Sequence, residues 1–80
     1  MRRRLKCETN TPTMCRRVLD TFLVSDHAEA YEVDPRNVQV DFEHGQWWVT
    51  DVASGAQWSV FDVGATSLGF ELVTEPQERW

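Results

Sequence analysis

The sequence contains no long apolar segment. Nowhere in its 80 residues does an apolar run reach the length of about 18 residues that a membrane-spanning helix needs. A signal peptide is not expected either, because the basic residues at 2–4 lead into a polar stretch at 7–13 instead of an apolar region. We therefore expect a cytoplasmic protein whose residues 1–80 form a single small domain with a modest core.

Cysteine and histidine are also scarce. The only cysteines are Cys7 and Cys15, and in a reducing compartment two such residues are expected to be free thiols, with a disulfide between them as the alternative. Their spacing fits no zinc motif, and His27 and His44 lie in unrelated parts of the chain. The sequence therefore predicts neither a metal site nor another cofactor.

Catalytic motifs are missing in the same way, since the sequence has no glycine-rich phosphate-binding loop. The run Ser-Asp-His at 25–27 holds residue types that catalyse nucleophilic reactions, but neighbours on a helix point apart, so a helix cap is the preferred interpretation. Asp41 and Glu43 could form a carboxylate pair of the glycosidase type, yet a solvated polar surface is preferred on so small a domain. The sequence predicts a protein that is not an enzyme.

Positive charge is nearly absent beyond the start of the chain. Residues 18–78 hold twelve acidic residues and Arg36 alone, whereas six of the eight Lys and Arg residues lie within 1–17. An acidic body is therefore expected behind a basic arm at 1–10. The arm is either a solvated tail that pairs with the body or a nucleic-acid-binding arm, and the acidic body opposes the second interpretation by repelling phosphates.

The segment 11–34 is expected to be helical in two parts. It opens with Thr-Pro, which is typical of an N-cap followed by the first helical position. Apolar residues then recur every fourth position and form a stripe that packs on a sheet. The residues of this stripe are Met14, Val18 and Phe22. A second, short helix is expected after Ser25, and Pro35 ends the helical segment because proline disfavours a helical residue before it.

The segment 37–74 is predicted to form an antiparallel sheet. Aromatic and β-branched residues alternate with polar ones, and His-Gly at 44–45 and Ser-Gly at 54–55 interrupt the alternation where hairpin turns need positive φ. A fourth strand is expected over 70–74. The predicted fold class is α+β, with the N-terminal helix packed on a three- to four-stranded antiparallel β-meander.

Two-residue turns would fix the register of this sheet. The first turn pairs Phe42 with Trp47, and the second pairs Trp48 with Phe61. The two partners of each pair share a face. The face toward the helix would then carry Val38, Val40, Phe42, Trp47, Val49, Trp58 and Val60. The opposite face would be polar apart from an aromatic spot formed by Trp48 beside Phe61.

Several runs in the second half of the chain resemble small uncharacterised prophage-type proteins. These runs are Trp-Val-Thr-Asp at 48–51, Ser-Gly-Ala-Gln-Trp-Ser-Val at 54–60, Gly-Phe-Glu at 69–71 and Val-Thr-Glu at 73–75. In size, acidity and element pattern the chain is also similar to the small acidic inhibitor proteins of phages and mobile elements, which include anti-CRISPR proteins and other DNA mimics. The resemblance implies a protein that occupies the basic nucleic-acid-binding groove of a protein partner.

The predicted partner-binding surface is acidic, with the aromatic spot at its side. Carboxylates two residues apart on a strand are about 7 Å apart and neighbouring strands about 4.8 Å apart, which is the spacing scale of backbone phosphates. The residues assigned to this surface are Asp41, Glu43, Asp51, Asp62, Glu71, Glu29, Glu32, Asp34, Trp48 and Phe61.

The leading hypothesis from the sequence is an anti-CRISPR-like, non-enzymatic inhibitor that blocks a nucleic-acid-handling complex through this acidic surface. The alternatives are a nucleic-acid-binding regulator that acts through its basic arm and a small accessory protein that oligomerises. Under the leading hypothesis, neither a membrane, nor a small-molecule substrate, nor nucleic acid itself is an expected partner.

Overall fold

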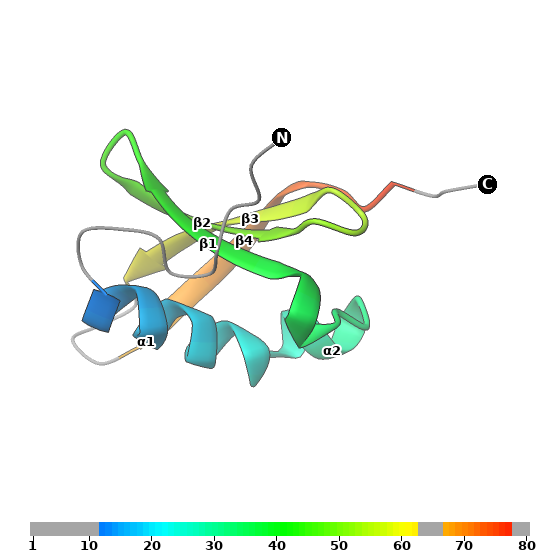
Figure 1. Cartoon of the computed structure of the whole chain (residues 1–80), viewed down its shortest axis with the longest axis horizontal. Helices are drawn as coiled ribbons and strands as arrows, with labels where there is room; N and C mark the ends of the chain where they lie inside the picture. The colour runs from blue at the N-terminus through cyan, green and yellow to red at the C-terminus, as the bar shows by residue number, and fades with distance from the viewer. Residues whose placement is uncertain (1–11, 63–66, 78–80) are drawn as a thin grey trace.

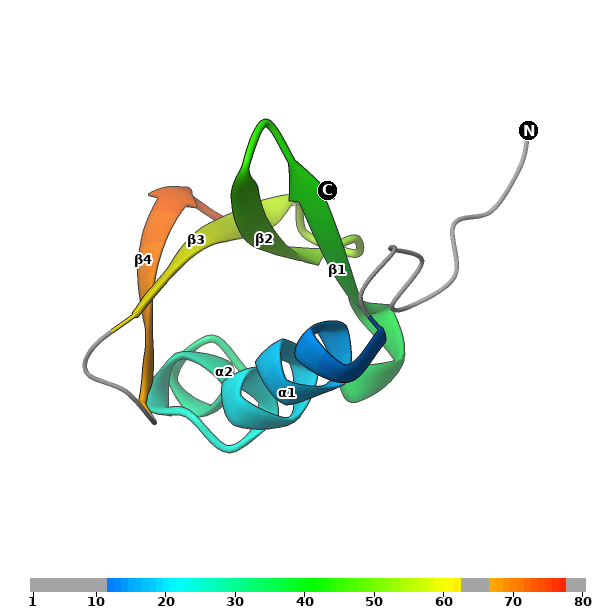
Figure 2. The ribbon, with the colours of Figure 1, turned by 90° about the vertical axis from the view of Figure 1, so that its left-hand side faces the viewer.

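A four-stranded sheet with helices on one face forms the body of the protein. The structure, a computed structural model, describes residues 12–62 and 67–77. The elements are α1 (Pro12–Leu23), α2 (Asp26–Ala30), the 3₁₀ turn η1 (Pro35–Asn37), β1 (Val38–Glu43), β2 (Gln46–Asp51), β3 (Ala56–Asp62) and β4 (Leu68–Thr74). The strands are antiparallel in the order β1-β2-β3-β4, and both helices lie against the same face (Figures 1 and 2). The predicted α+β fold is confirmed.

The helix α1 begins at Pro12, where the sequence places its first helical position. The apolar stripe faces the sheet: Val18 and Phe22 are fully buried, and Met14 is half-buried against the core. The arm at 1–10 and Cys7 lie outside the described residues. No helix within 12–62 and 67–77 combines the length and apolarity needed to cross a bilayer.

The connection from α1 to the sheet is built by short polar side chains. Ser25 precedes α2, but its hydroxyl donates back to the Phe22 carbonyl oxygen at 2.6 Å and does not cap α2. The turn η1 was not predicted. Its first residue is Pro35, and the Asp34 carboxylate caps it by accepting the Arg36 backbone N–H at 2.9 Å. An acidic residue directly before proline was the available signal.

The first hairpin has the predicted register. Phe42 lies opposite Trp47, and the two turn residues His44 and Gly45 have φ values of 55° and 74°. Two consecutive positive φ angles define the type I′ turn, whose twist matches that of the flanking strands. The His-Gly pair therefore sets the geometry at the tip of the β1–β2 hairpin.

The second hairpin differs from the prediction. Asp51 pairs with Ala56, so the loop between them has four residues and not two. The Asp51 carboxylate accepts the Ala53 N–H at 3.1 Å and the Ser54 hydroxyl at 3.0 Å, and these bonds hold the longer turn. The register is therefore shifted by two residues. A shift of two keeps every side chain on its predicted face, because side chains alternate along a strand.

Trp58 lies at the centre of the core and is fully buried. Its ring centroid is 4.8 Å from that of Phe22, and Phe22 is in turn 5.2 Å from Phe70. The Trp58 Nε1–H donates to Nδ1 of His27 at 3.1 Å, which satisfies a polar group that would otherwise be buried without a partner. This bond joins α2 to β3 and was not predicted from the sequence.

The predicted core face is wrong at the tip of the first hairpin. Phe42 is 47% exposed and Trp47 is half-buried, although both were assigned to the buried face. The hairpin tip projects away from the helices (Figure 1). Trp47 packs against the edge of the core, and its ring contacts that of Phe42 with centroids 4.9 Å apart.

Candidate functional site

The sheet face that turns away from α1, called the outer face, carries one continuous row of side chains across all four strands. The registers align one residue from each strand in this central row. Its members are Asp41, Trp48, Ser59 and Glu71. Three strand spacings of about 4.8 Å place the backbones of the two edge strands about 14 Å apart. An aromatic residue thus lies inside the row, and a carboxylate lies on each edge strand.

Two further residues extend the outer face toward the hairpin tip. Glu43 is exposed at the end of β1, two residues beyond Asp41, and Phe61 on β3 is 47% exposed. The predicted direct pairing of Trp48 with Phe61 is wrong, because the longer second loop places Ser59 opposite Trp48. Phe61 lies two residues beyond Ser59 on β3, so both aromatic residues still belong to the outer face.

The strands themselves contribute acidic side chains but neither Lys nor Arg. The segment 37–78 contains seven acidic residues and neither Lys nor Arg. Like charges on a rigid surface add their potentials, and a protein face of one sign attracts partners of the other sign. The outer face is therefore a fixed negative surface with an apolar centre.

The remaining acids of the predicted surface lie elsewhere. Asp51 is 8% exposed and is committed to the β2–β3 turn, so it contributes no exposed charge to the outer face. Glu29 and Glu32 are exposed on and just after α2, in the helical layer. Asp34 forms an ion pair with Arg36 at 2.8 Å. The side-chain hydrogen bond that Arg36 donates to the Asp34 carboxylate, followed by the charge of that carboxylate, raises the pKa of Arg36.

These positions divide the predicted surface into two parts. Asp41, Glu43, Glu71, Trp48 and Phe61 lie together on the outer face, whereas the acids at 29–34 lie beside the helices. Asp62 is the last residue of β3, and its backbone pairs with Leu68. Strand alternation thus predicted which strand residues share the outer face, but the sequence could not show that the acids near α2 belong to the other layer.

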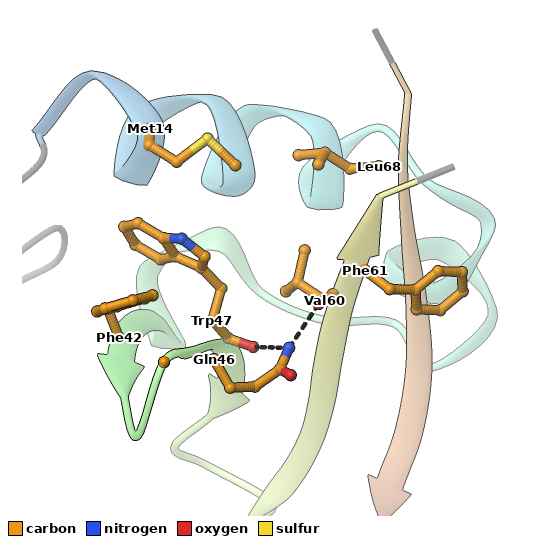
Figure 3. A pocket seen from close by; sticks show the side chains of 8 residues that line it. Met14, Phe42, Gln46, Trp47, Val60, Phe61 and Leu68 are labelled. Atoms are coloured by element: carbon orange, nitrogen blue, oxygen red, sulfur yellow. Dashed lines mark hydrogen bonds between the residues drawn. The ribbon is translucent and has the colours of Figure 1, made fainter. Parts of the chain in front are cut away.

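A pocket of about 360 Å³ opens between the β1–β2 hairpin tip and the end of β3 (Figure 3). It exists because β2 and β3 pair only from Trp48 to Asp51, so the first two residues of β2 separate from β3. The residues that line it are Met14, Phe42, Gly45, Gln46, Trp47, Val60, Phe61 and Leu68. No sequence signal marked this pocket, since it arises from strands that diverge.

One side chain bridges the two diverging strands. The Gln46 Nε2 group donates to the Val60 carbonyl oxygen at 2.5 Å and to the Trp47 carbonyl oxygen at 3.2 Å (Figure 3). The first of these bonds links β2 to β3 beyond the point where their pairing ends. The Trp47 indole points toward Met14 on α1. The Phe61 ring points away from Trp47, on the β4 side. The pocket wall is therefore held in place and is mainly apolar.

Two residues of the Ser-Asp-His run at 25–27 are engaged in structural bonds. Ser25 donates its hydroxyl to a main-chain carbonyl, and Nδ1 of His27 accepts the Trp58 indole N–H. In the part of the chain that the structure describes, no three His, Cys, Asp or Glu side chains gather in a group that could hold a metal ion. No protein-family model, curated protein or solved structure matches this chain.

Proposed function

We propose that the chain is a non-enzymatic protein-binding inhibitor whose outer face occupies the basic groove of a nucleic-acid-handling protein. The observation that carries the proposal is the central row, with Glu71 at one edge, Asp41 at the other and Glu43 beside it, on strands that carry no Lys or Arg. Carboxylates on a rigid sheet keep fixed spacings. They are suited to Lys and Arg side chains that are themselves spaced to hold phosphates.

The aromatic residues of the outer face give this proposal a source of affinity beyond charge. Exposed ion pairs contribute little free energy on their own, because water and salt screen them. Trp is among the residues that contribute most to protein interfaces, and its ring face attracts Lys and Arg cations. Trp48 lies between the two edge carboxylates, so a guanidinium over its ring would have acidic groups nearby on both sides.

The test compares two charge-reversed variants with equal changes in net charge. The first, Glu43→Lys with Glu71→Lys, reverses the outer face. The control, Glu29→Lys with Glu32→Lys, reverses exposed acids in the helical layer. Immobilised parent is used to capture proteins from a bacterial lysate. We expect it to retain a nucleic-acid-binding protein that salt releases and that duplex DNA displaces, because DNA and the chain compete for one groove.

The outer-face variant should lose this capture and the control variant should keep it. The proposal is wrong if the outer-face variant captures the same protein as well as the parent does, or if duplex DNA fails to displace that protein. A gel-shift assay with labelled duplex DNA and the chain alone distinguishes the inhibitor from the alternative function, a nucleic-acid-binding regulator. A shift that weakens with salt would favour a regulator acting through its basic arm and would count against the inhibitor.

A further inference from the structure

We infer that the pocket between the β1–β2 hairpin tip and β3 receives one large apolar side chain of the partner, next to basic residues that meet Glu43. The inference rests on the proposed function and adds the feature that the partner must present. It follows from three properties of the site: an apolar wall, a position beside the outer face, and a carboxylate at its edge.

The wall of the pocket favours an apolar side chain over a polar small molecule. None of the eight lining residues is charged. Among the described lining residues, the polar side-chain groups are the Trp47 indole N–H and the Gln46 amide, whose Nε2 group is already bonded to two main-chain carbonyl oxygens. Sites for polar small molecules usually place several polar groups around the ligand, and such groups are few here. Aromatic and aliphatic walls are instead typical of the pockets that hold anchor residues at protein interfaces.

The volume of the pocket agrees with this occupant. At about 360 Å³ it lies at the lower end of the range of about 300–1,000 Å³ for ligand pockets. Phe42 and Phe61 are both 47% exposed and belong to its lining. An inserted ring or branched aliphatic chain would contact Phe42 and the Trp47 indole and would exclude water from both.

The pocket and the acidic outer face are contiguous. Gln46 lines the pocket and lies opposite Glu43 in the register, and Phe61 belongs to both surfaces. One short segment of a partner can therefore place an apolar residue in the pocket and a flanking Lys or Arg beside Glu43. Charge complementarity thus identifies the occupant as part of a basic protein.

Two synthetic peptides with blocked ends provide the probe. One has the sequence Arg-Arg-Phe-Arg-Arg, and the other replaces Phe with Gly while keeping the charge. Each is titrated into the full chain, labelled with ¹⁵N, and followed by the indole N–H signal of Trp47. We expect the Phe peptide to bind about tenfold more tightly, which is the gain from burying one large apolar side chain, and to shift the Trp47 signal.

A pair of matched variants locates the effect. Phe42→Ala removes one wall of the pocket, and Val52→Ala removes a similarly exposed apolar side chain (51%) from the β2–β3 loop outside it. Phe42→Ala should abolish the preference for the Phe peptide, and Val52→Ala should preserve it. If Phe42→Ala fails to fold, Phe61→Ala serves in its place, because Phe61 lines the same pocket and is equally exposed.

The outcomes separate the two proposals. Equal affinity of the parent for both peptides, or a preference for Phe that persists in Phe42→Ala, overturns the pocket inference. Glu43→Lys should weaken both peptides to a similar extent. If Glu43→Lys weakens both but the parent shows no preference for Phe, only the pocket inference is wrong. If Glu43→Lys weakens neither while the preference persists, the apolar part of the pocket inference stands, whereas its basic flank at Glu43 and the charge-based function are wrong.

Discussion

Replacement of Trp58 gives the most demanding test of the core. The side chain is fully buried, and its ring packs against Phe22 with centroids 4.8 Å apart. Truncating a buried Trp to Ala lowers the free energy of unfolding by about 3–5 kcal/mol. A chain of 80 residues is expected to have a total of only about 4–12 kcal/mol, at about 0.05–0.15 kcal/mol per residue. Trp58→Ala should therefore remove a large fraction of the stability.

The hydrogen bond from Trp58 to His27 can be measured separately from the packing. Trp58→Phe keeps an aromatic ring but removes the Nε1–H donor, and His27→Phe removes the acceptor. In His27→Phe the indole N–H is left buried without a partner, which costs about 1–3 kcal/mol. In the double variant neither group remains, so the two losses should not add. The expected coupling energy is about 0.5–1.5 kcal/mol.

Urea unfolding followed by circular dichroism gives all four free energies of this cycle. The bond as described is wrong if the two single losses add to within about 0.3 kcal/mol, the scatter seen for independent sites. Thermal unfolding tests the packing. A loss of 1 kcal/mol lowers the melting temperature of a domain this size by about 4–8 °C, so Trp58→Ala should lower it by at least about 12 °C. A melting temperature within a few degrees of the parent would refute the central position of Trp58.

Two other predictions concern the turns and are tested by urea and thermal unfolding. Asp51→Ala removes the acceptor of two hydrogen bonds in the β2–β3 turn and should destabilise the fold by about 1–3 kcal/mol. Asp51→Asn keeps one side-chain oxygen and should cost less. Equal losses of stability in the two variants would contradict this role of Asp51. Gly45→Ala should cost about 1 kcal/mol through its positive φ alone, because nothing lies within 4 Å of an added Cβ. His44→Asn should stabilise the fold slightly, since Asn adopts positive φ more readily than His. A Gly45→Ala variant more stable than His44→Asn would contradict the type I′ turn.

Local sequence rules were enough to predict α1 and the first hairpin. The start at Pro12, the apolar stripe from Met14 to Phe22 and the turn at Gly45 each depend on residues close together in the chain. The tertiary fold retains these local preferences, so the elements appear where the sequence places them.

Side-chain bonds explain what the sequence did not predict. The second loop has four residues because Asp51 captures the Ala53 N–H and the Ser54 hydroxyl, and this competes with the shorter turn that Ser-Gly indicated. The bond from Trp58 to His27 joins residues 31 positions apart. The pocket depends on Gln46 reaching Val60 across two strands that have separated. Periodicity contains no information about such distant pairs.

Of the candidate site, the sequence could predict only the part that follows from strand alternation, namely which strand residues lie on the outer face. Asp41, Glu43 and Glu71 were assigned to the surface from the alternating pattern, and they lie on the outer face as that pattern requires. Asp51 was assigned there from its charge, although its place beside Ala56 at the end of β2 makes it a turn residue. Charge alone does not distinguish a surface acid from an acid that caps a turn.

The acids of the outer face could also serve only to protect the edges of the sheet, and the proposed function must be distinguished from that role. Asp41, Glu43 and Glu71 lie on β1 and β4, the two edge strands of the sheet, and charges on edge strands prevent sheets from joining edge to edge. Protection of an edge needs charge of either sign, whereas binding to a basic groove needs negative charge. Glu71→Lys should therefore leave the solution mass of the chain unchanged and still weaken its binding to a basic partner. If Glu71→Lys binds a basic partner as well as the parent does, edge protection alone explains these acids.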